Sequence, residues 1–219
     1  MGNSFGLALY LAISARWKGF AERLLTKRLA NGKEDPDRID ERRGIAGLPR
    51  PDGPLLWLHA ASVGESLSTL ELIRFIGQRR PEITVLVTTG NRTSATLMSI
   101  RLSKNAIHQF VPVDVKEYVQ RFLDYWKPDM AIWTESELWP RLVHEMGLTG
   151  KPMMLLNARM GMESHRRWRW AHSMAKSVLS RFDLALAQDE DSSRHLRQLG
   201  FPQEKIEVTG FLKEGARVL

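Results

Sequence analysis

The stretch His59-Ala60-Ala61-Ser62-Val63-Gly64-Glu65 follows the apolar run 55–58, and together they predict a buried strand that ends in a sharp turn. The turn passes through Ser62 and Gly64 and presents the Glu65 carboxylate where a helix begins. Ligands of open α/β sheets bind just outside the carboxyl ends of strands. A glutamate held there can take a proton from a substrate hydroxyl, or it can simply stabilise the first turn of the helix. The local pattern alone slightly favours the second interpretation.

A second turn of the same kind lies later in the chain. The short apolar strand 129–132 runs into Trp133-Thr134-Glu135-Ser136-Glu137-Leu138-Trp139-Pro140. Proline is well tolerated in the first turn of a helix, so we expect a helix to begin near Pro140. Glu135 and Glu137 can hydrogen-bond the backbone N–H groups at that helix end, or they can face a ligand. If the two strands are parallel neighbours, both acidic turns open on the same edge of the sheet.

From residue 54 onward, short apolar strands alternate with helical patterns. The expected strands are 55–60, 83–89, 107–112, 130–134, 153–157, 184–188 and 206–209. The expected helices are 66–79, 93–103, 115–126, 138–146, 166–181 and 190–199. This alternation predicts an α/β fold with a Rossmann-like parallel sheet and helices on both faces. The G-x-G-x-x-G fingerprint and the Walker phosphate loop are both absent from the sequence, so dinucleotide and ATP binding have no support.

Length and composition fit one such domain with an acidic partner. A chain of 219 residues is long enough to bury a substantial core. The net charge of +7 favours nucleic acid, an anionic membrane surface or a phosphorylated lipid as partner. The sequence contains no cysteine, which excludes disulfides and thiolate metal sites. The six histidines follow no metal-ligand spacing, so we expect no metal.

The N-terminal residues predict a membrane-associating segment over 1–30. The apolar run 5–13 is much shorter than the ~20 residues that cross a bilayer. Apolar residues then recur at helical spacing, with basic residues between them. The apolar set is Trp17, Phe20, Ala21, Leu24 and Leu25, and the basic set is Arg16, Lys18, Arg23, Lys27 and Arg28. This pattern is typical of an anchor on a membrane surface, although an ordinary helix packed on the domain would also show it. Residues 31–53 read as a charged connector, and 54–219 as the Rossmann-like domain.

The stretch from Asn157 to Trp170 is the most basic and aromatic part of the chain. Its arginines and tryptophans can bind nucleic acid, or Arg159 can hold the phosphates or sugars of a glycolipid. We favour a binding role for Arg159, because it lies just beyond a strand end on the ligand edge. Nucleic acid ranks last, since no recognised binding motif accompanies the charge.

Taken together, these motifs identify a family. The chain resembles the 3-deoxy-D-manno-octulosonic acid (Kdo) transferases, which add Kdo to lipid A precursors in Gram-negative bacteria. The matching segments are His59 to Glu65, Thr88-Thr89, Pro112-Val113-Asp114, Glu135 to Pro140, Asn157-Ala158-Arg159, Ala187-Gln188, Val208-Thr209-Gly210 and Leu212-Lys213. The resemblance implies one half of a B-type glycosyltransferase fold, whose N-terminal domain binds the lipid acceptor and whose C-terminal domain holds most of the CMP-Kdo site. It covers only the first half of the family's usual length.

The resemblance also implies residue roles. Glu65 would be the general base that deprotonates a sugar hydroxyl of the acceptor, lipid IVA, within the turn made by Ser62 and Gly64. Glu135 or Glu137 would orient the acceptor or brace that turn. The residues that would help to hold the acceptor are Arg159 and Ser164. The donor would be CMP-Kdo, with no cofactor and no metal, and the protein would lie on the cytoplasmic face of the inner membrane.

Two expectations depend on what the chain lacks or changes relative to the family. The donor-binding domain is missing, so the chain is a fragment, has its second half on another chain, or is a non-catalytic glycolipid-binding module. Arg141 stands where an asparagine is common and is expected to alter acceptor contacts. The turn 90–94 replaces a more usual Met-Thr-Pro-Thr-Gly sequence, and 161–163 and 213–215 also depart from the family pattern.

Overall fold

In the computed structural model, which describes residues 4–135 and 138–212, seven strands form one parallel sheet in the order β3-β2-β1-β4-β5-β6-β7. The strands are β1 (Leu55–His59), β2 (Thr84–Thr89), β3 (Ala106–Phe110), β4 (Met130–Thr134), β5 (Met153–Ala158), β6 (Leu184–Ala187) and β7 (Ile206–Val208). Every neighbouring pair is parallel. The predicted Rossmann-like sheet is therefore confirmed, with each strand ending within two residues of the expected position.

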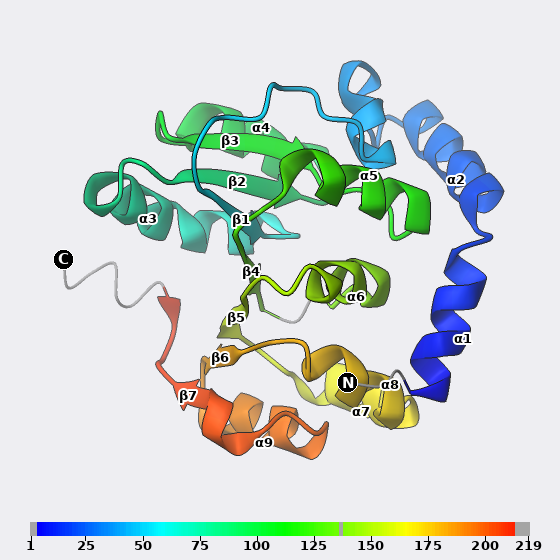
Figure 1. Ribbon diagram of the computed structural model, residues 1–219, viewed down its shortest axis with the longest axis vertical. Coiled ribbons are helices and arrows are strands. Elements are labelled where there is room, and N and C mark those ends of the chain that lie inside the picture. The colour runs from blue at the N-terminus through cyan, green and yellow to red at the C-terminus, as the bar shows by residue number, and fades with distance from the viewer. Residues whose placement is uncertain (1–3, 136–137, 213–219) are drawn as a thin grey trace.

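Helices cover both faces of the sheet (Figure 1). The helices that follow the strands are α3 (Val63–Arg79), α4 (Arg92–Arg101), α5 (Lys116–Trp126), α6 (Pro140–Leu148), α7 (Met162–Trp170), α8 (His172–Leu179) and α9 (Glu190–Gln198). Because successive side chains of a strand point to opposite faces, β1 contributes side chains to the core on both faces of the sheet. Leu58 packs in one cluster with Ile73 of α3, and Trp57 packs in another with Phe122 of α5. The core consequently has two apolar layers, one on each side of the sheet.

The direction of the chain across the sheet reverses between β1 and β4. The first three strands add outward in the order β1, β2, β3, and the chain then returns to place β4 on the other side of β1. Leu58 of β1 pairs with Ile132 of β4. In open α/β sheets such a reversal leaves a crevice at the carboxyl ends of the two strands, where ligands bind.

Two N-terminal helices, α1 (Phe5–Ser14) and α2 (Lys18–Ala30), flank the face covered by α5 and α6 (Figure 1). Ser4 caps α1 by accepting a hydrogen bond from the Leu7 N–H at 3.3 Å. No helix in the described part of the chain has the length and hydropathy of a bilayer-crossing segment.

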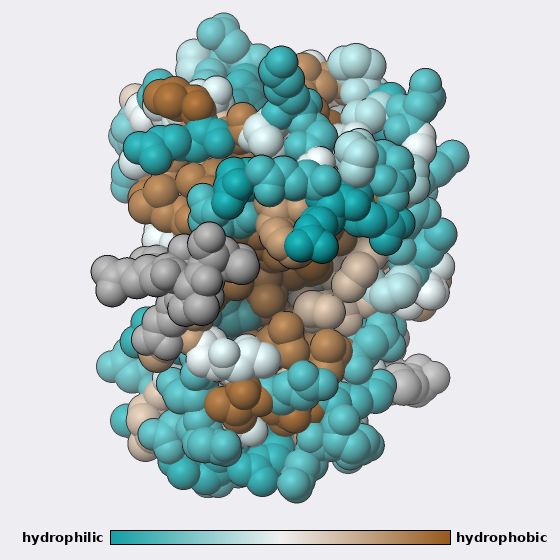
Figure 2. Space-filling view, turned by 90° about the vertical axis from the view of Figure 1, so that its left-hand side faces the viewer, coloured by the Kyte–Doolittle hydropathy of each residue, from teal (hydrophilic) through white to brown (hydrophobic). Residues whose placement is uncertain are grey.

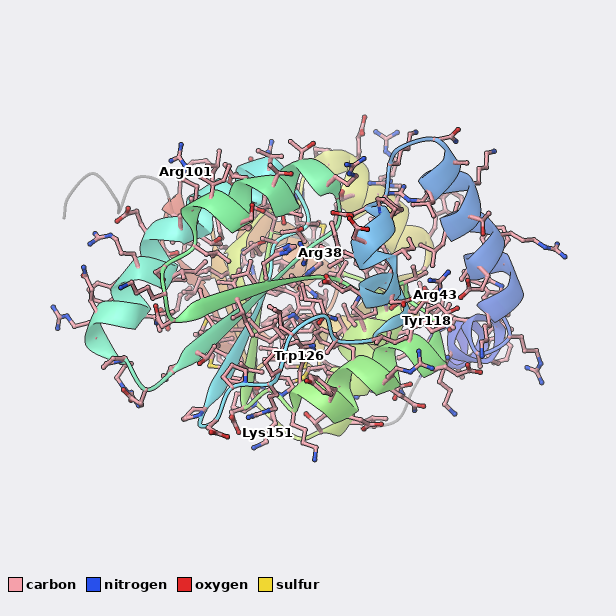
Figure 3. The ribbon with its side chains drawn as sticks, turned by 90° about the horizontal axis from the view of Figure 1, so that it is seen from above. Arg38, Arg43, Arg101, Tyr118, Trp126 and Lys151 are labelled. Atoms are coloured by element: carbon pink, nitrogen blue, oxygen red, sulfur yellow. The ribbon has the colours of Figure 1, made fainter. Side chains whose placement is uncertain are left out.

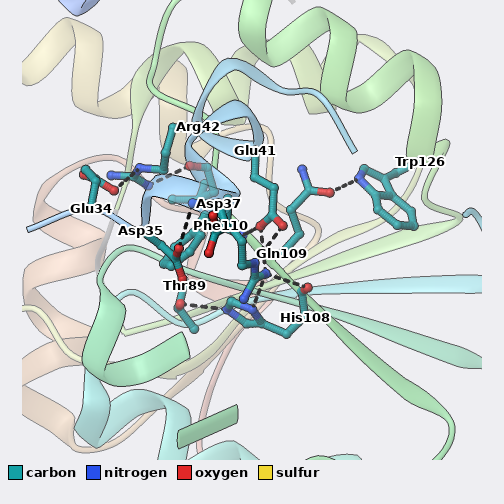
Figure 4. Close-up of polar contacts among 12 residues, drawn as sticks. Glu34, Asp35, Asp37, Glu41, Arg42, Thr89, His108, Gln109, Phe110 and Trp126 are labelled. Atoms are coloured by element: carbon teal, nitrogen blue, oxygen red, sulfur yellow. Dashed lines mark hydrogen bonds and ion pairs between the residues drawn. The ribbon is translucent and has the colours of Figure 1, made fainter. Parts of the chain in front are cut away.

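The 3₁₀ helix η1 (Pro36–Arg43) fastens the charged connector to the carboxyl end of β3 (Figure 4). Arg38 donates to both carboxylate oxygens of Glu41 at 2.8 Å, and its Nη2 lies 2.9 Å from Nδ1 of His108. Glu41 in turn accepts from the Phe110 N–H at 2.7 Å. The connector therefore packs as part of the domain instead of forming a loose linker.

Side-chain contacts also join α2 to η1 and α5. Arg43 and Tyr118, which lie close together in Figure 3, both contact the Glu22 carboxylate. The Arg43 Nη2 lies 2.9 Å from Glu22 Oε2. These contacts fix the inner face of α2 on the domain.

The single helix predicted over 166–181 is wrong. The structure has two helices, α7 and α8, separated at Ala171, whose φ of −114° and ψ of 41° are not helical. A uniform helical pattern in the sequence does not reveal a break that is set by packing. The break turns α8 onto α1 and α6, where Ala175 and Val178 are buried.

Candidate active site at the switch point of the sheet

Glu65 lies in the first turn of α3, which begins three residues earlier than predicted. Ser62 is the N-cap, and its Oγ accepts a hydrogen bond from the Glu65 N–H at 3.2 Å. The Glu65 Oε2 accepts from the Ala61 N–H at 3.0 Å, which reproduces a capping box displaced by one residue. Glu65 therefore does stabilise the helix start, as the alternative interpretation expected.

The carboxylate also contacts the neighbouring strand across the reversal point. The Thr134 Oγ1, at the end of β4, lies 2.8 Å from Glu65 Oε2 and 3.0 Å from the His59 carbonyl oxygen. Glu65 is only 4% exposed, so burial and these bonds hold Oε2 in one place. None of the residues that the structure describes forms a hydrogen bond to the other oxygen, Oε1. The carboxylate thus lies at the switch point, where the strand order reverses between β1 and β4. Its Oε2 is held by two hydrogen bonds, and its Oε1 has none from the described residues.

Asn91 braces the same turn and was not selected by sequence reasoning. Its Nδ2 donates to the Ala61 carbonyl at 3.1 Å, and its Oδ1 caps α4 by accepting from the Ser94 N–H at 2.9 Å. The departure from the family pattern at 90–94 therefore supplies a contact to the Glu65 turn. An asparagine following a strand and preceding a helix is the signal that could have found it.

Gly64 does not make the sharp turn that the sequence suggested. It is helical, and a Cβ added there would have Ser62 Oγ, at 3.9 Å, as its nearest neighbour. Gly64 is exposed, and the space over it is open. Neither backbone conformation nor packing requires a glycine at this position.

Two non-glycine residues adopt left-handed backbone conformations at this edge. Glu135, directly after β4, has a φ of 55°, and Asn157, near the end of β5, has a φ of 53°. Such conformations cost free energy and are concentrated at functional sites. The Glu135 N–H donates to the Leu156 carbonyl at 3.0 Å, which joins the two strand ends. Glu137 lies outside the described residues.

Arg159 and Ser164 are placed farther along the same edge. Both follow β5, and β4 lies between β5 and the strand that leads to Glu65. Arg159 is exposed, and its charge helps to lower the pKa of Asp189 after the larger effect of the Ser192 N–H bond. Ser164 lies on α7, where its Oγ accepts from Arg167 Nη2 at 3.3 Å. The sequence-predicted residues that the structure describes therefore follow strands along one edge of the sheet.

Two cavities open near this edge. One, of about 590 Å³, lies beside the starts of α3 and α4 and is lined by Val63, Arg92 and Thr93 among others. The other, of about 500 Å³, lies between α1, the start of α6 and α7, and includes Ser164. Both volumes are within the range of small-molecule sites. Val63 places the first cavity two residues from Glu65.

His59 is a buried structural residue next to the candidate base. Its Nδ1 lies 3.0 Å from Thr88 Oγ1, and burial lowers its pKa to about 4, so the ring is neutral near pH 7. Within residues 4–135 and 138–212, no three His, Cys, Asp or Glu side chains are grouped to hold a metal ion.

The Arg141 side chain is buried between α6 and α1, and its effect on acceptor contacts stays a prediction. It is 3% exposed, and its Nε donates to Ser14 Oγ of α1 at 2.9 Å. Its Nη2 bonds the Leu11 carbonyl, and its Nη1 lies 2.7 Å from Glu145 Oε1. The guanidinium ties the N-terminal helix to α6.

Sequence comparison identifies relatives along most of the chain. The family profile described as 3-deoxy-D-manno-octulosonic-acid transferase (kdotransferase) matches residues 37–216. The 3-deoxy-D-manno-octulosonic acid transferase of Rickettsia bellii is 37% identical over 79% of this chain and 41% of its own length. A probable mitochondrial Kdo transferase of Arabidopsis thaliana is 31% identical over 96% of this chain and 45% of its own. The chain spans less than half the length of these curated relatives.

Solved structures agree on the fold. The UDP complex of Staphylococcus aureus MnaA superposes with a TM-score of 0.55 at 16% identity, over 76% of this chain and 47% of that one. UDP-GlcNAc 2-epimerase of Neisseria meningitidis superposes with a TM-score of 0.52 at 15% sequence identity. The match covers 73% of this chain and 47% of the epimerase chain. At this identity the likeness shows only a shared Rossmann-like half. With the family profile matching most of its length, the chain belongs to the 3-deoxy-D-manno-octulosonic-acid transferase family.

Proposed function

We propose that this chain is the acceptor-binding half of an inverting glycosyltransferase that moves Kdo from CMP-Kdo to lipid IVA. Glu65 is its general base. The observation that carries the proposal is the Glu65 carboxylate at the switch point, with Oε2 held by the Ala61 N–H and the Thr134 hydroxyl. A base must be held within reach of the proton it abstracts, and the two hydrogen bonds to Oε2 leave Oε1 for that task.

In the proposed step, Glu65 Oε1 takes the proton of an acceptor sugar hydroxyl. The hydroxyl oxygen forms a bond to the anomeric carbon of Kdo, the bond to CMP breaks, and CMP leaves with the electron pair. Attack opposite the leaving group inverts the configuration. The sugar ring carries positive charge in the transition state, as in glycoside hydrolysis. Glu135, whose backbone is strained beside Thr134, orients the acceptor, and Arg159 and Ser164 hold it farther along the edge.

The division of labour is part of the proposal. Residues 54–219 bind the acceptor, 31–53 connect, and 1–30 associate with the membrane. The donor-binding domain belongs to the second half of the family length, because the matched relatives are more than twice as long as their aligned portions. The reaction needs no metal or cofactor and involves no nucleic acid.

We place the protein on the cytoplasmic face of the bacterial inner membrane. The outer face of α1 and α2 carries an apolar ridge, made of the exposed side chains of Phe5, Leu9, Ile13, Trp17, Phe20 and Leu24. Phe5 is 85% exposed and Phe20 is 63% exposed. Basic residues flank this ridge, as expected for a helix lying in the interface of an anionic membrane.

The test is Kdo transfer to lipid IVA by this chain mixed with the C-terminal half of the Rickettsia bellii relative. The expected result is activity that falls about 10²- to 10⁴-fold in Glu65→Gln, the usual contribution of a positioned acid–base group. The matched control is Glu71→Gln, since Glu71 is exposed on the same helix and forms an ion pair with the equally exposed Arg74. Equal activity of Glu65→Gln and wild type rejects Glu65 as base. Lipid IVA binding without any transfer favours a non-catalytic glycolipid-binding module instead.

A further inference from the structure

The cavity between α1, α6 and α7 has the make-up of a site for an acyl chain. Its volume is about 500 Å³, and its wall combines polar groups with three aromatic side chains, those of Tyr10, Trp139 and Trp168. The lining residues are Tyr10, Asp114, Leu138, Trp139, Pro140, Ser164, Arg167, Trp168, Ala171 and Met174. Trp139, Trp168 and Met174 also pack against the main core, so these walls are held by the fold.

Asp114, the acidic residue in the lining, already accepts three hydrogen bonds from the protein. Asp114 Oδ2 accepts from the Tyr10 hydroxyl at 2.6 Å and from the Arg141 N–H at 3.0 Å. Asp114 Oδ1 accepts from the Leu142 N–H at 2.8 Å. A buried carboxylate with three donors has little capacity left for a ligand. The aromatic and aliphatic side chains of the lining are therefore the part of the wall that an acyl chain would contact.

The rim is cationic. Arg167 reaches the rim beside Ser164, and Arg166 and Arg169 of the same helix line a second hollow with Trp170, which is 90% exposed. Across residues 4–135 and 138–212, none of these three arginines forms an ion pair. Arginines free of acidic partners beside an exposed tryptophan suit an anionic headgroup at a membrane interface.

Tyr10 joins this cavity to the apolar ridge of α1 and α2. It lines the cavity and also packs edge-to-face on Trp17 of the ridge, with ring centroids 6.2 Å apart. On the other side of the cavity, Met174 lies beside Gly6 of α1. A chain leaving a bilayer docked on the ridge would meet Tyr10 first. This continuity favours a membrane lipid over a soluble amphiphile as occupant.

We propose that this cavity binds one acyl chain of an anionic membrane lipid, with Arg167 on the headgroup and Tyr10, Trp139 and Trp168 on the chain. Identifying this lipid with the acceptor rests on the proposed function. The cavity is then the acceptor's acyl subsite, and the acceptor is selected by its lipid part as well as by its sugar.

The test measures binding with no Kdo donor present, so it is independent of catalysis. Calorimetry compares dihexanoyl phosphatidic acid, below its micelle concentration, with glycerol phosphate as the headgroup alone. Ala171→Phe fills the cavity, and Ala12→Phe adds the same side chain on the exposed face of α1 as control. The expected result is at least tenfold weaker lipid binding in Ala171→Phe, with glycerol phosphate binding unchanged and Ala12→Phe like wild type.

A second measurement does not depend on the folding of Ala171→Phe. Bromine atoms on an acyl chain quench the fluorescence of tryptophans that they touch. Quenching of the wild-type protein by bromo-acyl phosphatidic acid should fall in Trp139→Phe and Trp168→Phe, and less in Trp126→Phe, whose ring is buried elsewhere. Unchanged quenching in the first two variants, or equal lipid affinity of Ala171→Phe and wild type, overturns the proposal. Lost transfer with this binding pattern intact would reject the catalytic function and leave the lipid site standing.

Discussion

The two oxygens of the Glu65 carboxylate have different surroundings, and the difference depends on Thr134. The Thr134 hydroxyl has one proton and two acceptors within 3.0 Å, Glu65 Oε2 and the His59 carbonyl. The hydroxyl can therefore donate to the Glu65 carboxylate when that group is ionised. It can donate to the His59 carbonyl instead when Glu65 is protonated. We treat Thr134 as a positioning residue for the proposed base.

Replacing Thr134 separates this role from packing. Thr134→Val keeps the shape but removes a hydrogen bond to a charged group, a loss of about 1.5–3 kcal/mol. If the bond is needed in the transition state, kcat falls roughly 10- to 150-fold with little change in KM. Thr134→Ser restores the hydroxyl and should recover most of the rate. Steady-state kinetics of the reconstituted enzyme decide the matter, and a pure KM effect in Thr134→Val would contradict the role.

The sequence predicted the residues of the turn but not their contacts. Ser62, Gly64 and Glu65 stand together in the chain, so a local pattern reveals them. Thr134 and Asn91 belong to other strand ends, and only the strand order brings them to Glu65. The role of Arg141 was missed for the same reason, since its partners in α1 lie more than 120 residues away.

At the scale of elements, alternating apolar and polar segments were enough to predict seven strands and most helix limits. The break at Ala171 was not predicted, because it depends on where α8 packs and not on local propensity. The same packing leaves one face of α1 and α2 exposed. On the opposite side of the molecule, apolar side chains gather in a band across the middle (Figure 2).

The exposed ridge predicts how α2 contributes to membrane binding. Phe20→Glu removes an apolar contact of about 1.5–3 kcal/mol and adds a charge repelled by anionic lipid. Co-sedimentation with phosphatidylglycerol vesicles should fall at least tenfold. Thr26→Glu adds the same charge to an exposed position of α2 and serves as the matched control. Equal losses in the two variants would show that only net charge matters and that the ridge is not inserted.

At the scale of the whole molecule, two buried histidines predict the pH dependence of folding. Burial lowers the pKa of His59 to about 4 and that of His108 to about 3, while the unfolded chain titrates near 6.5. Between these values the unfolded state binds more protons. Stability is therefore complete above about pH 6.5 and is lost as the pH falls toward 4 and then 3.

Urea unfolding at pH 7, 5 and 4 measures this effect. The loss assigned to His59 is on the order of 3 kcal/mol by pH 4, since one pKa unit corresponds to about 1.4 kcal/mol. His59→Asn cannot take up the proton, so its stability should fall less on acidification, whatever its stability at pH 7. Parallel curves for the variant and the wild type would show that carboxylates, not His59, govern acid unfolding.

The Arg141 contacts make the N-terminal helix difficult to remove. The guanidinium is buried and satisfied by Ser14, the Leu11 carbonyl and Glu145. Trimming the chain before residue 15 would strip away two of these partners and leave a charge facing a vacated groove, a situation that costs several kcal/mol. Helix α1 is thus a structural member of the domain, and exchanging its outward side chains should cost less stability than removing the helix.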